Sequence, residues 1–320
     1  MAETTKYSFD EPRFHDPEVA RKFLESVRWP KGAVCPHCGA VENQYEIGGK
    51  AARPGLRECG HCHEQYTVTV GTVFERSKIS LDKWLFAAGL MASSKKGVSS
   101  KQIERMLGVT YKTAWFMTHR LREAMKSGGG LLGGSGSTVE ADETFVGRKP
   151  GRKIKQGFGH KNAVFSLVER KGNVRSFHVP NVTANTLKPI IQAHMDNKSF
   201  LMTDDAGQYR IIGPVSISHD IINHSSKQYV RGHVHTNTVE GFFSIFKRGI
   251  YGVYHHVSEQ HLHRYTSEFD FRYNYRERRV KIDGRWEKIG YNDEERTTAL
   301  LKGISNKRLT YRRINKRAQA

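Results

Sequence analysis

The chain has 320 residues, 37% of them hydrophobic, and a formal net charge of +20. The length predicts two or three domains, and the charge favours a polyanionic partner, because Lys and Arg release counterions condensed on a phosphate backbone. The sequence has no apolar run of membrane-spanning length and no apolar signal-peptide core at its N-terminus, so we expect a cytoplasmic protein without a membrane partner. A merely soluble basic protein is the alternative interpretation of the charge.

All four cysteines lie in the first segment, residues 1–78, in two C-x2-C pairs with twenty residues between them: Cys35 and Cys38, then Cys59 and Cys62. Each pair can lie on a tight turn with both sulfurs pointing inward, and four thiolates form the tetrahedron of one structural Zn²⁺. Two disulfides are the alternative, which the short spacing and a cytosolic setting disfavour. We therefore predict an N-terminal segment with a zinc ribbon whose closed site is structural and not catalytic.

Residues 79–126 predict helices. The stretch "SLDKWLFAAGLMASS" has a helical apolar face after a Ser80 cap. A short helix over 100–107, a turn at Gly108 and a longer basic helix over 110–125 then give the helix-turn-helix pattern. Lys112, Arg120 and Arg122 are the candidate DNA contacts on the second helix. A plain helical hairpin is the alternative, because the motif is weak in sequence.

The composition changes at residues 127–138, where "SGGGLLGGSGS" is typical of a Gly/Ser linker. Strand-like stretches, a helix, another strand and further helices follow over 139–280, which predicts an α/β domain with a mixed sheet and flanking helices. The last segment, 281–320, is predicted to be a basic tail. From 302 to 317 it carries seven basic residues and no acid, and we expect it to bind DNA nonspecifically or to be disordered without it.

Two acids end predicted strands in this domain. Asp142 follows "STVEA" and Asp204 follows "SFLMT", and strands that stop at one sheet edge bring such carboxylates together. Adjacent carboxylates repel unless they share a hard cation, and oxygen ligands suit Mg²⁺ or Mn²⁺. A third acid on a crossing helix, Glu240, would complete a two-metal site for phosphodiester chemistry. Alternation puts Glu143 on the opposite strand face, whereas Glu140 shares the face of Asp142.

The motifs "VEADETFVGRK", "TDDAGQY" and "HTNTVEGFFSIFKRGI" resemble those of IS1595-family insertion-sequence transposases, in the ISXO2-like branch. The resemblance extends from about residue 14 to 279 and includes the zinc ribbon and helix-turn-helix. It implies a catalytic domain of the ribonuclease-H-like (retroviral integrase) fold with a DDE triad of Asp142, Asp204 and Glu240 as ligands of two Mg²⁺ or Mn²⁺ ions. It also implies that Lys247 contacts a transposon-end phosphate, and it favours Asp204 over its neighbour Asp205.

Further candidates surround these motifs. His224, His235 and Asn237 lie near the third acid in sequence, where a histidine could orient a water or a phosphate, or be an ordinary satisfied polar group. Arg272 and Arg276, in the stretch "HLHRYTSEFDFRYNYRERR", are candidate phosphate contacts.

Together these features predict a DNA transposase, which the resemblance places in the prokaryotic nucleoid. Such an enzyme binds the terminal inverted repeats of an insertion sequence, hydrolyses a phosphodiester at each end and joins the freed 3′-hydroxyl to target DNA. Because both ends must be held together, we expect at least a homodimer on DNA. Two alternatives stay open: a noncatalytic DNA-binding regulator built from the zinc ribbon and helix-turn-helix, and an inactive domesticated copy.

Overall fold

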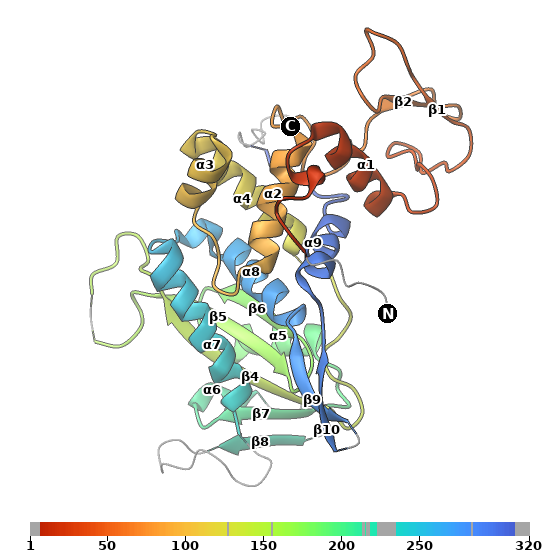
Figure 1. The fold of residues 1–320 in the computed structure, drawn as a ribbon. Helices are drawn as coiled ribbons and strands as arrows, with labels where there is room; N and C mark the ends of the chain where they lie inside the picture. The colour runs from red at the N-terminus through yellow and green to blue at the C-terminus, as the bar shows by residue number, and fades with distance from the viewer. Residues whose placement is uncertain are drawn as a thin grey trace, which may run out of the picture. The chain divides into compact units, whose positions relative to one another are not determined.

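A computed structural model describes residues 7–126, 128–154, 156–212, 215, 218–222, 235–282 and 284–310. The chain forms two compact units. Unit 1 consists of residues 1–94, 98–125 and 277–320, and unit 2 consists of residues 95–97 and 126–276. Each unit is described here by itself (Figure 1).

Unit 1 is built around helices whose ends follow local capping rules. Asp16 caps the first long helix by accepting hydrogen bonds from two backbone N–H groups, and Pro17 occupies the first helical position. Ser99 caps the third in the same way, and that helix ends at Gly108 with a left-handed φ of 61°. The helices of unit 1 are η1 (Pro12–Phe14), α1 (Pro17–Arg28), α2 (Leu81–Ser93), α3 (Ser100–Leu107), α4 (Tyr111–Met125) and α9 (Asp293–Lys302).

Two small antiparallel sheets belong to the same unit. One has the order β1-β2-β3, with β1 (Gln44–Glu46), β2 (Arg57–Cys59) and β3 (Gln65–Tyr66). The other pairs β9 (Arg278–Ile282) with β10 (Arg285–Ile289). The first sheet lies within the segment that was predicted to be a zinc ribbon.

Unit 2 contains a five-stranded mixed sheet of order β6-β5-β4-β7-β8. Strands β4, β5 and β6 pair antiparallel, whereas β7 and β8 continue from β4 in parallel. This confirms the prediction of a mixed sheet with flanking helices. Its elements are β4 (Thr138–Val146), β5 (Asn162–Glu169), β6 (Val174–Val179), α5 (Ala184–His194), β7 (Phe200–Asp204), α6 (Gly207–Ile211), β8 (Ser218–Ile222), α7 (Asn237–Gly249), the π-helix η3 (Ile250–Tyr254), η4 (Glu259–His261) and α8 (Leu262–Asn274).

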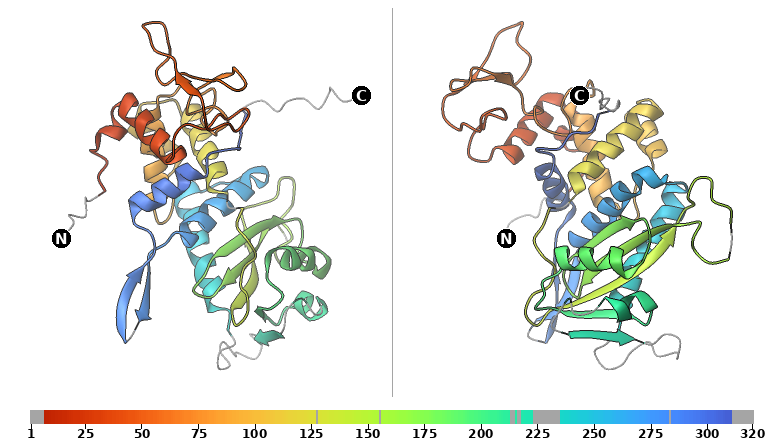
Figure 2. Two further views of the ribbon diagram at one scale, coloured as in Figure 1. Left: turned by 90° about the vertical axis from the view of Figure 1, so that its right-hand side faces the viewer. Right: turned by 180° about the vertical axis from the view of Figure 1, so that it is seen from behind.

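The central strands bury both faces, so their apolar residues divide between two cores. Ala141 and Phe165 lie in one core with residues of α5 and α6, and Val164 and Phe246 lie in the other with residues of α7 and α8. The left view of Figure 2 shows the strands between α5 on one side and α7 and α8 on the other. The sheet is therefore the middle of three layers, and α7 crosses the face that carries even-numbered β4 residues.

Two segments expected to be flexible are packed. In the Gly/Ser segment 127–138, Leu132 is 3% exposed and pairs with Met195, and the Arg175 guanidinium donates to two glycine carbonyls of that segment. In the basic tail, Ile304 is fully buried and its carbonyl accepts from the backbone N–H of Val73. The start of the tail, for which the sequence predicts nonspecific DNA binding or disorder without DNA, therefore packs in unit 1, while residues 311–317 lie outside the described ranges.

Candidate metal and nucleic-acid sites

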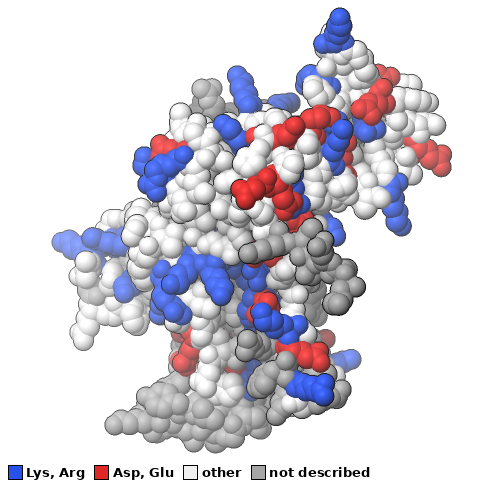
Figure 3. Space-filling model, in the orientation of Figure 1, with Lys and Arg blue, Asp and Glu red and all other residues white. Residues whose placement is uncertain are grey.

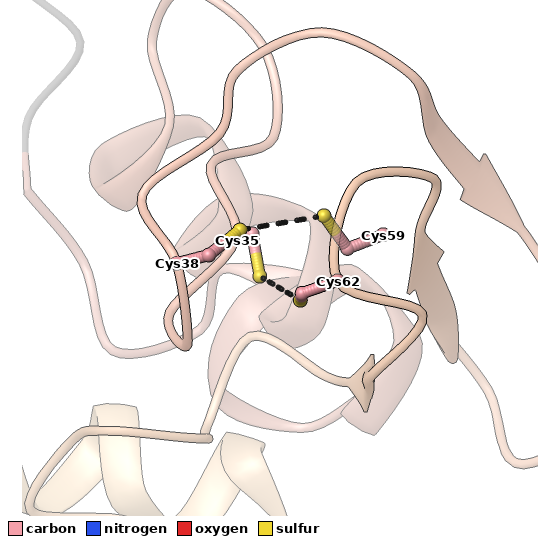
Figure 4. A group of neighbouring side chains, drawn as sticks. All are labelled: Cys35, Cys38, Cys59 and Cys62. Carbon is pink, nitrogen blue, oxygen red and sulfur yellow. Dashed lines mark hydrogen bonds between the residues drawn. The ribbon is translucent and has the colours of Figure 1, made fainter.

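The four cysteines converge on one point in the ribbon (Figure 4). The Sγ atoms of Cys35 and Cys62 are 3.7 Å apart, those of Cys38 and Cys59 are 3.6 Å apart, and all four lie within 4.8 Å of one another. A disulfide would need about 2.05 Å, and all four cysteines are free. Sulfurs bound at about 2.3 Å to one tetrahedral Zn²⁺ stand about 3.8 Å apart, so the set fits a structural zinc ion.

Hydrogen bonds from nearby groups prepare these sulfurs for a metal. The backbone N–H of His37 donates to the Cys35 sulfur at 3.4 Å, and the Gln44 side chain donates to the Cys59 sulfur at 3.6 Å. Cys35 and Cys59 are buried. Donors of this kind favour thiolate over thiol, which is the form that binds zinc.

Asp142 and Asp204 lie on one face of the sheet. The parallel pairing of β4 with β7 sets Glu140 beside Met202. Two residues further along each strand stand the two aspartates, so the same register brings both to one face. The prediction that Asp142 ends its strand is wrong, because β4 continues to Val146 through its pairing with β5. Asp204 is the last residue of β7, and its Oδ1 accepts a hydrogen bond from the backbone N–H of Ala206 at 3.2 Å.

Burial raises the pKa of Asp142 to about 8, and the carboxylates of Glu143, Asp204 and Glu240 add to this increase. Asp204 and Glu240 thus both act electrostatically on Asp142. Unlike the four cysteines, the three carboxylates do not all lie within 4.8 Å of one another.

Glu143 lies on the opposite face, as strand alternation predicts. Its carboxylate accepts hydrogen bonds from the Tyr209 hydroxyl at 2.5 Å and from the Gln208 amide at 2.6 Å, both on α6. Burial also raises the pKa of Glu143. Because this carboxylate is engaged with α6, it belongs to the structural core and not to the face that carries Asp142.

Glu140 fixes the start of α7, a function that the sequence analysis did not anticipate. The side chain is fully buried, and it accepts from the backbone N–H groups of Thr238 and Val239 at 2.8 and 3.0 Å. Arg170 donates to the same carboxylate at 2.6 Å and to the His235 carbonyl at 2.7 Å. A carboxylate at a helix N-terminus is favoured by the helix dipole. In the sequence, only the alternation that puts Glu140 on the same strand face as Asp142 pointed to this function.

Glu240 lies in the first turn of α7, exposed, with Oε1 accepting from the Thr236 hydroxyl at 2.9 Å. The opposite side of the helix is buried through Val239, Phe242 and Phe246, so core packing and the Glu140 anchor together fix where Glu240 stands. Lys247 is exposed two turns later on the same side of the helix.

The auxiliary candidates do not form one group. His235 places Nδ1 3.2 Å from the Glu140 carboxylate, which associates it with the α7 anchor. Asn237 is the exposed first residue of α7, and His224 lies outside the described residues.

The structure corrects most of the arginine assignments, because it buries the side chains. Arg122 is 1% exposed, and Arg120 is 8% exposed and donates to the Glu75 carbonyl at 3.0 Å. Burial lowers the pKa of Arg120, and nearby Arg308 adds to this effect. Lys112, at the start of α4, is exposed.

In unit 2, Arg272 is 9% exposed and forms an ion pair with buried Glu268. Arg276 lies 3.3 Å from the ring centroid of Tyr273 and donates to the carbonyl of that residue. Arg272 is therefore a core residue and not a phosphate contact.

Comparison with known proteins identifies the family of this chain. Residues 131–274 match the family model of the ISXO2-like transposase domain, and residues 15–65 match that of the transposase zinc-ribbon domain. An uncharacterized transposase-like protein of Haemophilus influenzae is 30% identical over 112 residues, which cover 35% of this chain and 89% of that protein. The chain belongs to the IS1595 family of ISXO2-like transposases. A further relative, an uncharacterized protein in transposable element ISH50 of Halobacterium salinarum, is 28% identical over 272 residues, covering 79% of this chain and 89% of the relative.

The two family matches assign the cysteines and the candidate catalytic residues to different parts of this transposase. The ribbon match contains all four cysteines, and the domain match contains Asp142, Asp204, Glu240 and Lys247. Helices α2 to α4 lie between the two matches and α9 lies beyond them. Within the described ranges, none of the helices has the length and apolar character needed to cross a bilayer.

Proposed function

We propose that this family member is an active DDE transposase whose Asp142, Asp204 and Glu240 hold two Mg²⁺ or Mn²⁺ ions. The observation that carries the proposal is that Asp142, within β4, and Asp204, at the end of β7, share the face of the sheet that α7 crosses. Burial, together with the charges of Glu143, Asp204 and Glu240, raises the pKa of Asp142 to about 8. When bound, such ions align the attacking and leaving oxygens of a phosphodiester and stabilise its charge.

The topology supports the same proposal. Three antiparallel strands continued by two parallel ones, in the order β6-β5-β4-β7-β8, resemble the ribonuclease-H-like fold that the family implies. In that arrangement, Asp142 lies on the central strand and Asp204 on its parallel neighbour. We infer that the Glu140 anchor positions α7 so that Glu240 completes the set and Lys247 meets the phosphate beside it.

Different residues of the chain then have different functions in the proposed reaction. The three carboxylates set where a scissile phosphate is held, and the buried face of α7 keeps Glu240 from moving away from the strands. Hydrolysis at each transposon end breaks a P–O bond and leaves a 3′-hydroxyl. That hydroxyl then attacks a target phosphate and displaces a second 3′-oxygen, so no Ser or Tyr nucleophile is required.

We further infer that unit 1 recognises the transposon ends. The zinc ribbon and the pair α3–α4, taken as a helix-turn-helix, form the DNA-binding part. In such motifs the N-terminal residues of the second helix contact base edges, and in α4 the exposed residues are at that end: Tyr111 and Lys112. Since both ends must be held at once, we propose that the protein acts as a homodimer or larger assembly on DNA.

Cleavage and joining of labelled transposon-end duplexes in Mg²⁺ test the proposed function. We expect wild type to release the 3′ end and join it to a second duplex, and Asp142→Asn and Glu240→Gln to bind the duplex without cutting it. Metal-dependent cleavage at the wild-type rate in either variant would refute the assignment. Specific binding without cleavage by the wild-type protein would instead favour a noncatalytic regulator.

A further inference from the structure

The exposed side of α7 continues past Lys247. Glu240, Ser244, Lys247 and Tyr251 stand at positions i, i+4, i+7 and i+11, and all four are exposed. Tyr251 exposes 48% of its surface, so its ring and hydroxyl are accessible from solvent. A helical stripe of this spacing lies on one side of the helix, so a strand bound at Glu240 and running along α7 would next meet Lys247 and then Tyr251.

The end of this stripe has an unusual backbone. Residues Ile250–Tyr254 form a π-helix, and His255 follows with φ 57° and ψ −54°. Such turns and such positive-φ residues are costly and concentrate at functional sites. A hydrogen bond to the core anchors the turn, because the Tyr254 hydroxyl donates to buried Glu268 at 2.6 Å. That anchor leaves Tyr251 facing outward on a rigid support.

A second basic segment lies beside the same turn. The Lys96 carbonyl oxygen would stand 2.8 Å from a Cβ at Gly249, and the Tyr254 hydroxyl 2.1 Å from a Cβ at Gly97. Both glycines thus permit a close approach of the Lys95–Gly97 segment, which belongs to unit 2, to the last turn of α7.

The charges of this surface are uncompensated. Lys95, Lys96, Lys247 and Arg248 are all exposed, and among the described residues no acid forms an ion pair with any of them. In Figure 3, Lys and Arg side chains gather over α7 in the middle of the visible face. Four positive charges around one helix end attract a polyanion such as DNA.

We propose that Lys95, Lys96, Arg248 and Tyr251 form a track that binds the sugar–phosphate backbone of transposon-end duplex DNA next to the cleaved phosphate. This inference rests on the proposed function, since it extends the DNA path away from the metal site. The lysines and Arg248 contact phosphates as charges, and the Tyr251 hydroxyl donates to one. Eleven residues of helix span roughly 16 Å, at about 1.5 Å per residue, so Tyr251 meets a phosphate about five nucleotides from the cut.

The test is the salt dependence of end binding, measured on the full chain with transposon-end duplex. Neutralising two phosphate contacts lowers the slope of log K against log salt by about 2, so the double variant Lys95→Ala/Lys96→Ala should show that decrease and bind about tenfold more weakly. Arg248→Ala should lower the slope by about 1. Tyr251→Phe should weaken binding without changing the slope, because the lost hydroxyl carries no charge.

Lys198→Ala is the matched control, because Lys198 is exposed in the turn that leads into β7, at the far end of the strand from Asp204. It should behave as wild type, and all variants should keep wild-type melting temperature and zinc content. An unchanged slope in the double variant, with metal-dependent cleavage intact in wild type, overturns the track and leaves the proposed function standing. If wild type neither binds nor cuts end duplex, both the track and the proposed function fail.

Discussion

At the scale of single residues, neighbouring acids of one strand have different functions. Asp142 and Glu140 share a face of β4, yet Asp142 faces other carboxylates, whereas Glu140 is fully buried and bonded to Arg170 and the start of α7. Sequence alternation predicts the shared face. It does not show which carboxylate meets donors and which meets acids, since those partners come from residues far along the chain.

Glu140→Gln should destabilise unit 2 strongly. Removing the charge leaves Arg170 without its partner, and breaking a buried pair from one side typically costs about 3–5 kcal/mol. The measurement is urea unfolding of the two proteins under the same conditions. Asp142→Asn is the matched comparison and should leave stability unchanged or raised, because it removes a charge held among carboxylates. Equal stability of Glu140→Gln and wild type would show that Glu140 does not anchor α7.

Asp270 makes the stability of unit 2 dependent on pH. Burial raises its pKa to about 7, although Ser176 donates to it through the backbone N–H at 2.8 Å and the hydroxyl at 2.6 Å. The unfolded chain, with an Asp pKa near 3.9, releases this proton first. Protonated Asp270 therefore contributes its full stabilisation to the folded state below about pH 4, and this contribution is lost as the pH rises to about 7.

Asp270→Asn cannot titrate, so the difference in unfolding free energy between the variant and wild type should shift in favour of the variant between pH 4 and pH 7. Denaturant melts across that range, with both proteins in each buffer, measure the difference. A difference that stays constant with pH would mean that Asp270 is ionised throughout.

At the scale of elements, the sequence predicts where helices begin and end better than it predicts which other helices pack against them. Helix 100–107 and the turn at Gly108 are confirmed, and the mixed sheet follows from strand and helix order. The burial of Arg120 and Arg122 could not be foreseen, because α4 packs against α2 and against α9. Helix α9 begins at Asp293, far along the chain, within a segment expected to be a basic tail. A local window shows the charge of an arginine but not the helix that covers it.

Lys112 and Arg122 offer a direct test of this difference within α4. Lys112→Ala should weaken binding to end duplex and leave the melting temperature unchanged. Arg122→Ala should instead destabilise unit 1 by about 2 kcal/mol, because it removes a side chain that is 1% exposed and hydrogen-bonded to Thr118. Binding isotherms and thermal melts on both variants separate the two effects, and the reverse result would restore Arg122 as the DNA contact.

The zinc ribbon should depend on its metal for folding. Cys35→Ser removes one of four ligands, and small zinc domains lose their fold without the ion. We expect zinc content to fall from one ion per chain towards zero and specific end binding to be lost, with unit 2 still folded. Metal analysis and binding assays test this. Retention of both zinc and end affinity would contradict the structural assignment of the cysteines.

At the scale of the whole molecule, the basic residues behind the net charge of +20 are distributed between the interior and the surface. Part of it is used internally, as in Arg120, Arg122 and Arg272, and part is exposed along α7 and at the start of α4. The charge alone therefore indicated the class of partner but not the path of the DNA. The proposed path depends on α7, its π-turn and the Lys95–Gly97 segment, which are distant in sequence and adjacent in unit 2.

In the proposed function, three carboxylates bind the divalent ions that cleave DNA. Direct titration of Mn²⁺, followed by electron paramagnetic resonance, tests it without relying on activity. Wild type should bind two ions, and Asp142→Asn, Asp204→Asn and Glu240→Gln should each lose at least one. Glu143→Gln is the control, because that carboxylate is bonded to α6 on the other face and acts on Asp142 only as a nearby charge, so this variant should still bind two ions. Wild-type Mn²⁺ binding in all three triad variants would contradict the account.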